Sequence, residues 1–334
     1  MKKSNSRKYR YQIFAIVWLL RFLALLSLKN ARRLAVFVAS IGWFFPTIHK
    51  KITLKNLEIC FPDLNVNERR KLAKKSLIES TKTAAEMGAL ALWDHKRCLA
   101  LVESVENEAL LDEAIAAKKG VILLAPHLGN WEMMRHFLAS KSTFIALYDP
   151  PKIAELEPLM IKMRDKVGMI SAPANQRGIA KLFRELGKGA VTAILPDTRP
   201  SKKAGGIFAP FFGIEALTPT FLQKAAQKTG AIVICGAAMR SPNGFRLCFL
   251  EADPKIYDPD ERTAATTLNR LIETCIRLDL AQYIWDYNRF RSRPSATPPP
   301  PPRSLRSSRR LNLLAKTKSR RYRLESFEHL LAAC

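Results

Sequence analysis

The chain has 334 residues, 48% of them hydrophobic, which is enough for one large α/β domain or two small ones. Its formal charge is +26 at pH 7, more than solubility requires, so an anionic partner is expected: a nucleic acid, a membrane surface or an acidic substrate. The six cysteines are scattered without a C-x-x-C pair. This argues against a disulfide framework and a zinc site, and suits a reducing compartment.

The N-terminal 50 residues are basic and apolar. Residues 1–10 carry five basic side chains and no acid, and two apolar runs follow, at 11–28 and 34–48. No small-residue cleavage site is present, so a cleaved signal peptide is not expected. The first run is near spanning length but contains Arg21, and basic residues flank it on both sides. We therefore predict a membrane anchor over residues 1–50, either one transmembrane helix or amphipathic helices lying in the interface.

From residue 51 the pattern predicts a folded α/β domain that ends at 294. Residues 51–118 are mostly helical in pattern, and strands alternate with helices from Gly120 onward. Strands are expected at 121–125, 143–147, 190–195, 231–237 and 245–250, and helices at 131–140, 153–166, 177–187, 219–229 and 261–280. This is an α/β fold with a mixed, mostly parallel sheet flanked by helices, and with an N-terminal membrane-associated helical segment. The SPNG turn predicts that the last two strands form a hairpin on the sheet edge.

The C-terminal segment has a different composition. Residues 295–334 begin SATPPPPPR and continue with many basic residues. A five-proline run favours polyproline II over a packed element. We expect a disordered basic tail outside the catalytic fold.

One stretch, GVILLAPHLGNWE at 120–132, places a histidine and a carboxylate after a buried strand. His127 follows that strand at its carboxyl end, where open α/β sheets bind ligands. Side chains five apart in one helix point about 140° away from each other, so His127 and Glu132 meet only if His127 precedes the helix. Glu132 would then fix the imidazole tautomer and leave the other nitrogen to take a proton. A turn histidine that caps a helix is the non-catalytic alternative.

Several other functional classes lack their motifs. The sequence contains no G-x-S-x-G, no G-x-G-x-x-G after a strand, no Walker A loop and no H-E-x-x-H. The sequence also shows no motif of a nucleic-acid-binding module. A histidine base beside a membrane anchor fits deprotonation of a hydroxyl for attack on an activated acyl group.

Three further segments carry candidate residues. Arg164, in LMIKMRDKVG, is placed on a helix to reach an anion or to pair with a neighbouring acid. Asp197, in VTAILPDTRP, follows another buried strand and should lie on the same sheet edge as His127, unless it only forms the turn after Pro196. Residues 205–213, GGIFAPFFG, are expected to be an apolar loop that lines an acyl-chain pocket or covers the core.

Together these pieces resemble the late acyltransferases of lipid A biosynthesis, within the wider glycerolipid acyltransferase group marked by H-x4-D/E. The matching text, in order, is NLEICFPDLNVNERRKL, APHLGNWE, KMRDKVGM, LPDTRP, APFFGIEALTPT, KTGAIVICGAAMR and QYIWDYNRFRSRP. The resemblance implies an α/β fold with a membrane-associated N-terminal helix. It also implies transfer of a fatty acyl chain from acyl carrier protein to a hydroxyl of a lipid A precursor, at the cytoplasmic face of the bacterial inner membrane.

By position, the resemblance makes His127 the general base and Glu132 the carboxylate that orients it. Arg164 and Asp197 are assigned to substrate binding, as is Asn130, which would also shape the turn. The implied partners are acyl carrier protein, an anionic lipid A precursor and the membrane; no nucleic acid, metal or cofactor is implied.

The sequence also departs from the family and leaves rival functions open. Tyr148-Asp149 stands where the family usually has a tyrosine-arginine pair, and PDTRP lacks the usual second acid. The oxyanion stabiliser is unassigned, with the backbone amides of residues 128–130 as candidates. An acyltransferase acting on a lysophospholipid or another glycolipid, with acyl-CoA as an alternative donor, is one rival; a non-enzymatic basic membrane-bound protein is the other.

Overall fold

The computed structural model describes residues 6–151, 153–200, 205–292 and 294, with side chains described from residue 11 onward, so the predicted tail at 295–334 lies outside it. The helices are α1 (Ser6–Leu25), α2 (Leu28–Gly42), α3 (Ile48–Cys60), α4 (Val66–Leu92), α5 (His95–Leu99), α6 (Glu108–Ala116), α7 (Glu132–Lys141), α8 (Glu157–Asp165), α9 (Gln176–Leu186), α10 (Phe221–Thr229) and α11 (Glu261–Ile276). The strands are β1 (Val102–Glu106), β2 (Val121–Leu124), β3 (Phe144–Tyr148), β4 (Ile170–Pro173), β5 (Val191–Ile194), β6 (Gly206–Phe211), β7 (Ile214–Pro219), β8 (Ile232–Arg240) and β9 (Phe245–Glu251).

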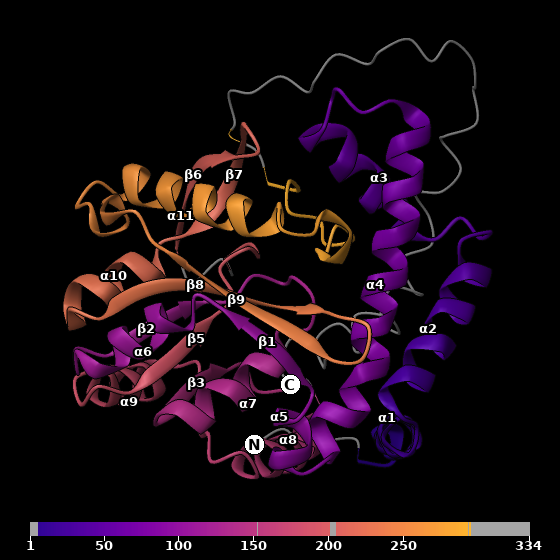
Figure 1. Cartoon of the computed structure of the whole chain (residues 1–334), viewed down its shortest axis with the longest axis horizontal. Helices are drawn as coiled ribbons and strands as arrows, with labels where there is room; N and C mark the ends of the chain where they lie inside the picture. Colours follow the sequence, from indigo (N-terminus) through magenta and orange to yellow (C-terminus); the bar gives the residue numbers. More distant parts are fainter. Residues whose placement is uncertain (1–5, 152, 201–204, 293, 295–334) are drawn as a thin grey trace.

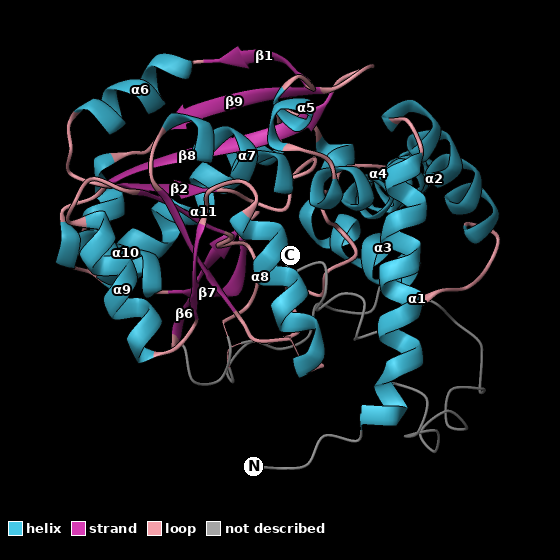
Figure 2. Cartoon of the chain, turned by 90° about the horizontal axis from the view of Figure 1, so that it is seen from below, coloured by secondary structure: helices cyan, strands magenta, loops and turns pink. Residues whose placement is uncertain are grey.

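A seven-stranded sheet forms the centre, in the order β1-β9-β8-β2-β5-β3-β4. Neighbouring strands are parallel except for β8 and β9, which form an antiparallel hairpin. The order at one side, β1, β9, β8, β2, can be followed in Figure 2. The predicted α/β class with a mixed, mostly parallel sheet is therefore confirmed.

Strand β2 occupies the middle of the sheet because its four residues are all apolar and fully buried. Their side chains alternate between the two faces. Ile122 and Leu124 pack into the core layer that includes α9, α10 and α11, whereas Val121 and Leu123 pack into the layer that includes α6 and α7. The strand is thus held from both sides, and its carboxyl end is a fixed point from which the following turn starts.

Some sequence predictions about the sheet were wrong. The β8–β9 hairpin does not form the edge, because β1 pairs in parallel with β9 and lies outside it. Residues 205–213 are not a loop, since most of them form β6, which pairs with β7 in a separate antiparallel ribbon. Strands β1 and β4 lie in segments where no strand was expected. All five expected strands are present.

Helices α1 and α2 pack on α4 and form the side of the molecule farthest from the sheet (Figure 1). α1 crosses α4 at Gly88, where a Cβ atom would lie only 2.5 Å from the Leu23 Cβ, so a larger residue would separate the helices. Trp93 at the end of α4 donates an indole hydrogen bond to the Ala24 carbonyl, at 2.8 Å.

The transmembrane alternative for the N-terminal segment is not supported. Among the residues that the structure describes, none of the helices combines the length and the apolar character that crossing a bilayer requires. α1 reaches 20 residues but carries Arg7, Lys8, Arg10 and Arg21.

Candidate active site

The turn after β2 is fixed by backbone hydrogen bonds to two other segments. The His127 carbonyl accepts from the Ile284 amide at 3.1 Å, and the Asn130 amide donates to the Ala238 carbonyl at 2.9 Å. Gly129 sits between them with φ +66°, and a Cβ at this position would lie 2.1 Å from the Ala238 oxygen. Only glycine allows this close approach, so the sequence H-L-G-N determines where the imidazole lies.

His127 is bound on its Nδ1 side by Asp197. The His127 Nδ1 and the Asp197 Oδ1 are 2.8 Å apart, and the His127 backbone amide donates to the other carboxylate oxygen at 2.9 Å. Asp197 follows β5, the parallel neighbour of β2, so both residues reach the same sheet edge as predicted. With Asp197 ionised, Nδ1 carries the proton of this hydrogen bond and Nε2 is left with a free lone pair.

Asp197 is fully buried, yet its pKa is lowered. Burial by itself raises the pKa, but the charge of His127 and the hydrogen bonds from its ring and backbone outweigh that effect. Two other buried groups face the same carboxylate. Burial raises the pKa of Tyr283, and the negative charge of Asp197 raises it further. Burial lowers the pKa of Arg289, and the charge of Asp197 partly opposes that lowering. Asp197 is therefore an ionised carboxylate in a closed environment.

Glu132 does not make the contact with His127 that the sequence predicted. It lies in the first turn of α7, where its Oε2 is 3.2 Å from the Nη1 of Arg135, one turn further along the helix. No hydrogen bond or ion pair between the described residues joins Glu132 to His127. Trp131 contacts the imidazole, with its ring edge-on at a centroid distance of 4.5 Å. The predicted contact is therefore absent, the partner of Nδ1 is Asp197, and a catalytic role of Glu132 stays a prediction.

Asn130 is fully buried and supports the turn from inside. Its Oδ1 accepts from the Glu132 amide at 3.2 Å, and its Nδ2 donates to Glu86 Oε2 at 2.9 Å. Both ends of the side-chain amide are therefore used within the protein. This agrees with the expected role in shaping the turn, and the expected substrate-binding role of Asn130 stays a prediction.

Arg164 lies on α8, outside the turn after β2. It is buried, its guanidinium lies over the Tyr148 ring at 5.5 Å, and the Tyr148 hydroxyl donates to Glu157 at 2.7 Å. Among the described residues no hydrogen bond or ion pair connects Arg164 with His127. The expected anion-binding role of Arg164 stays a prediction.

The backbone amides of residues 128–130 cannot serve as the oxyanion donors that were considered. Leu128 donates to the Pro126 carbonyl at 2.6 Å, Gly129 to the Gln282 carbonyl at 3.0 Å, and Asn130 to the Ala238 carbonyl. Each amide already has an acceptor inside the fold. Among the described residues, no group of three or more His, Cys, Asp or Glu side chains is arranged to hold a metal ion.

The sequence analysis missed a buried ionic cluster behind the turn, centred on Glu86 of α4. Its carboxylate, fully shielded from solvent, accepts from Arg32 Nε at 2.5 Å, from Arg240 Nε at 3.0 Å and from Asn130. Arg240 also donates to the Gly129 carbonyl at 3.2 Å. The available signal was a single acid within the apolar run AAEMGALAL, because an isolated charge in such a run requires a buried partner.

Comparisons with known proteins identify relatives of this chain. The family model described as bacterial lipid A biosynthesis acyltransferase matches residues 1–292. The lipid A biosynthesis lauroyltransferase of Escherichia coli K12 is 26% identical over 271 residues, which are 80% of this chain and 87% of that protein. The palmitoleoyltransferase of the same organism is 29% identical over 252 residues, 73% of this chain and 79% of that protein. A shorter match, 27% identical over 128 residues, joins 37% of the chain to 40% of a phosphatidylinositol mannoside acyltransferase of Mycobacterium tuberculosis. The matched region contains the His127–Asp197 pair, the turn that holds it and the helices behind it, and the chain belongs to the bacterial lipid A biosynthesis acyltransferase family.

Proposed function

We propose that the chain transfers a fatty acyl group from acyl carrier protein to a hydroxyl of a lipid A precursor, with His127 as the general base and Asp197 as the carboxylate that orients it. The observation that carries the proposal is the 2.8 Å contact between His127 Nδ1 and Asp197 at the carboxyl edge of β2. Family membership supplies the reaction class, acyl transfer in lipid A biosynthesis.

The reaction uses the free Nε2 of His127. This nitrogen takes the proton of the acceptor hydroxyl while the oxygen attacks the thioester carbonyl carbon, so that a C–O bond forms. The tetrahedral intermediate then collapses, the C–S bond breaks, and the leaving thiolate receives the proton from the imidazolium. Asp197 stabilises the imidazolium between the two steps and remains ionised, in keeping with its lowered pKa.

The other site residues have supporting roles in this scheme. Glu132 and Arg135 form an ion pair that fixes the start of α7 beside the base. Asn130 holds the turn by connecting it to Glu86. Arg164 is assigned to binding a phosphate of the acceptor, because a buried guanidinium matches phosphate in a bidentate manner.

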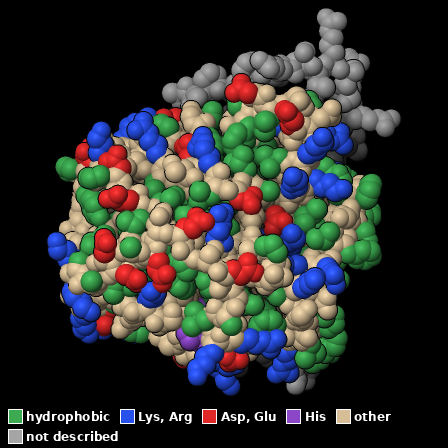
Figure 3. Space-filling view, viewed as in Figure 1, with side chains coloured by type: hydrophobic (Ala, Val, Ile, Leu, Met, Phe, Trp, Pro, Cys, Tyr) green, Lys and Arg blue, Asp and Glu red, His purple; other side chains and the backbone are tan. Residues whose placement is uncertain are grey.

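We also propose that α1 and α2 attach the enzyme to the cytoplasmic face of the bacterial inner membrane by lying in the interface. One face of α1 exposes Tyr11, Phe14, Trp18, Phe22 and Leu25, and α2 with the segment after it exposes Phe37, Val38, Ile41, Phe44, Phe45 and Ile48. Figure 3 shows hydrophobic side chains along the edge formed by these two helices, with Lys and Arg side chains beside them. A contiguous apolar surface with basic neighbours is the signature of an interfacial helix.

The direct test measures transfer of a labelled acyl group from acyl carrier protein to a lipid A precursor, with purified wild-type enzyme and His127→Ala in detergent. Transfer by the wild type and loss in a variant with an unchanged melting temperature are expected. Lysophospholipid and mannosylated glycolipid acceptors, and acyl-CoA as donor, are assayed in parallel. Preference for one of these would replace the proposed substrates, and full activity of His127→Ala would remove the mechanism.

A further inference from the structure

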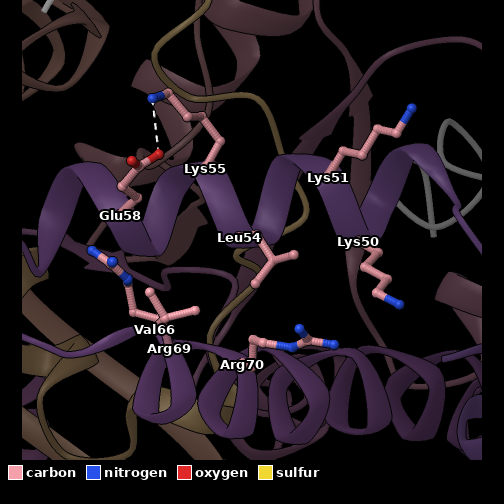
Figure 4. A pocket seen from close by; sticks show the side chains of 8 residues that line it. All are labelled: Lys50, Lys51, Leu54, Lys55, Glu58, Val66, Arg69 and Arg70. Atoms are coloured by element: carbon pink, nitrogen blue, oxygen red, sulfur yellow. Dashed lines mark hydrogen bonds and ion pairs between the residues drawn. The ribbon is translucent and has the colours of Figure 1, made fainter. Parts of the chain in front are cut away.

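A groove with basic walls lies between α3 and the first turns of α4 (Figure 4). Its volume is about 550 Å³, and a single carboxylate, Glu58, lines it. Five cations line the same groove: Lys50, Lys51, Lys55, Arg69 and Arg70. In Figure 4, Lys50 and Leu54 extend from α3 toward α4, while Lys51 and Lys55 extend from other sides of α3. Helix α3 therefore presents cations in more than one direction.

Much of this positive charge is not neutralised within the fold. Lys55 is paired with Glu58 at 2.9 Å, and Lys50 donates to the Trp43 carbonyl at 2.6 Å. Lys51, Arg69 and Arg70 make no ion pair with any residue of the described ranges. An uncompensated set of charges on two adjacent helices is not needed for their packing, so it is available to an external anion.

The basic surface continues toward the active site. A second, smaller groove on the other side of α3 is lined by Lys51, Lys55 and Asn56 together with Asn288 and Phe290. Asn56 donates to the Tyr287 carbonyl at 2.7 Å, and the Tyr287 hydroxyl accepts from the amide of Arg199, two residues beyond Asp197. A partner bound along α3 would thus lie against the segment that adjoins the catalytic carboxylate.

We infer that this basic surface of α3 and α4 docks an acidic helix of the protein that delivers the acyl group. The inference rests on the proposed function, under which the donor is acyl carrier protein. Lys51 and Lys55 are one helical turn apart on α3, as are Arg70 and Lys74 on α4, which is the spacing of carboxylates on one face of a docked helix. Most of the exposed large apolar side chains lie on α1, α2 and the segment between α2 and α3, and the groove itself contributes Val66 alone to that set, so the larger apolar surface lies outside the groove.

The test compares a double charge reversal in the groove, Lys51→Glu with Arg70→Glu, against a matched reversal elsewhere, Lys119→Glu with Arg177→Glu. All four side chains are exposed, and each double variant changes the net charge equally. For the groove variant, KM for the acyl carrier protein should rise about tenfold or more with kcat little changed, and the salt dependence of kcat/KM should weaken. Transfer from a small acyl thioester that carries no carrier protein should be unaffected. The control variant should resemble the wild type.

Two further measurements separate the outcomes. Binding of fluorescently labelled acyl carrier protein, followed by anisotropy, reports docking without turnover, and co-sedimentation with vesicles containing phosphatidylglycerol reports lipid binding. If the control variant shows the same loss, the net charge of the protein and not the groove determines the affinity for the carrier protein, and the docking surface is wrong. Loss of vesicle binding with unchanged carrier affinity would assign the groove to anionic lipid instead. If the wild type uses the small thioester but neither binds nor uses the carrier protein, the donor in the proposed function is wrong. If the wild type uses the carrier protein and the groove variant uses it equally well, the docking surface alone is wrong.

Discussion

Replacing Asp197 by Asn should inactivate the enzyme by changing the imidazole tautomer. The two carboxylate oxygens accept from two different donors, the Nδ1–H of His127 and its backbone amide. Asparagine offers one oxygen and one NH₂ group. The backbone amide can only donate, so it takes the oxygen, and the NH₂ group faces Nδ1. Nδ1 must then accept, the ring proton moves to Nε2, and Nε2 can no longer take a proton from the acceptor hydroxyl.

This loss has an expected size. General-base assistance contributes about 10²–10⁴-fold to a rate, and the wrong tautomer removes most of it. We therefore expect kcat of Asp197→Asn to fall by about 10³-fold, with KM for both substrates changed little, because no substrate contact is removed. Initial rates of labelled acyl transfer under saturating donor and acceptor measure this, with circular dichroism to verify folding.

The matched comparison is Glu132→Gln, which the sequence motif alone would rank as more damaging. In the structure this change weakens an ion pair with Arg135 and leaves the His127–Asp197 contact intact. Its kcat should fall by less than about tenfold, although the loss of a charge from a buried ion pair should lower the melting temperature. The opposite ranking, with Glu132→Gln inactive at full stability and Asp197→Asn active, would refute the assignment of Asp197 as the orienting carboxylate.

Three further outcomes follow from the site. Gly129→Ala should lower the free energy of unfolding by more than about 2 kcal/mol, measured in urea, because it combines a positive φ with a Cβ that collides with a neighbouring carbonyl. Glu86→Ala should cost about 3–5 kcal/mol, since two buried arginines lose their carboxylate, whereas Glu86→Gln should cost less; equal stability of all three proteins would exclude a role for the ionic cluster. The lowered pKa of Asp197 means that its ionised form stabilises the fold above the unfolded-state pKa of about 3.9, and that this stabilisation is lost as pH falls through the folded pKa. The difference in unfolding free energy between wild type and Asp197→Asn should accordingly stay constant above about pH 5 and shrink as the pH falls further in urea titrations, and a difference that grows on acidification would contradict the sign of the shift.

The interior of the sheet could be predicted from sequence, but its margins could not. β2 and β5 are short apolar runs that end in turn residues, and their length and β-branched residues favour a buried strand over a helix. β1 reads VESVE, with mostly exposed residues, because it lies at the edge of the sheet and needs only one apolar face. The ribbon β6–β7 was missed since GGIFAPFFG has three glycines and a proline, residues that are rare in central strands but tolerated in a separate two-stranded ribbon.

The site was predicted in position but not in pairing. Sequence proximity favoured Glu132 as the partner of His127, five residues away, over Asp197, seventy residues away. Parallel pairing of β2 with β5 reverses that order, because it brings the ends of both strands to one edge whatever their separation in the chain. Burial of the Glu86 cluster depends on how α2, α4 and β8 meet, which no local pattern contains.

That cluster gives α4 a function beyond packing. Arg32 comes from α2, one of the two helices whose exposed apolar faces we assign to the membrane, and Asn130 comes from the catalytic turn. Both side chains bind the same carboxylate of Glu86. A displacement of α2 therefore either moves the turn or breaks a hydrogen bond in a buried, low-dielectric site. Glu86 therefore links the helix that we assign to the membrane with the turn that carries the base. Under the proposed function this link has a use, because an acceptor hydroxyl held in the bilayer and a thioester that arrives from solution must meet at one nitrogen of His127.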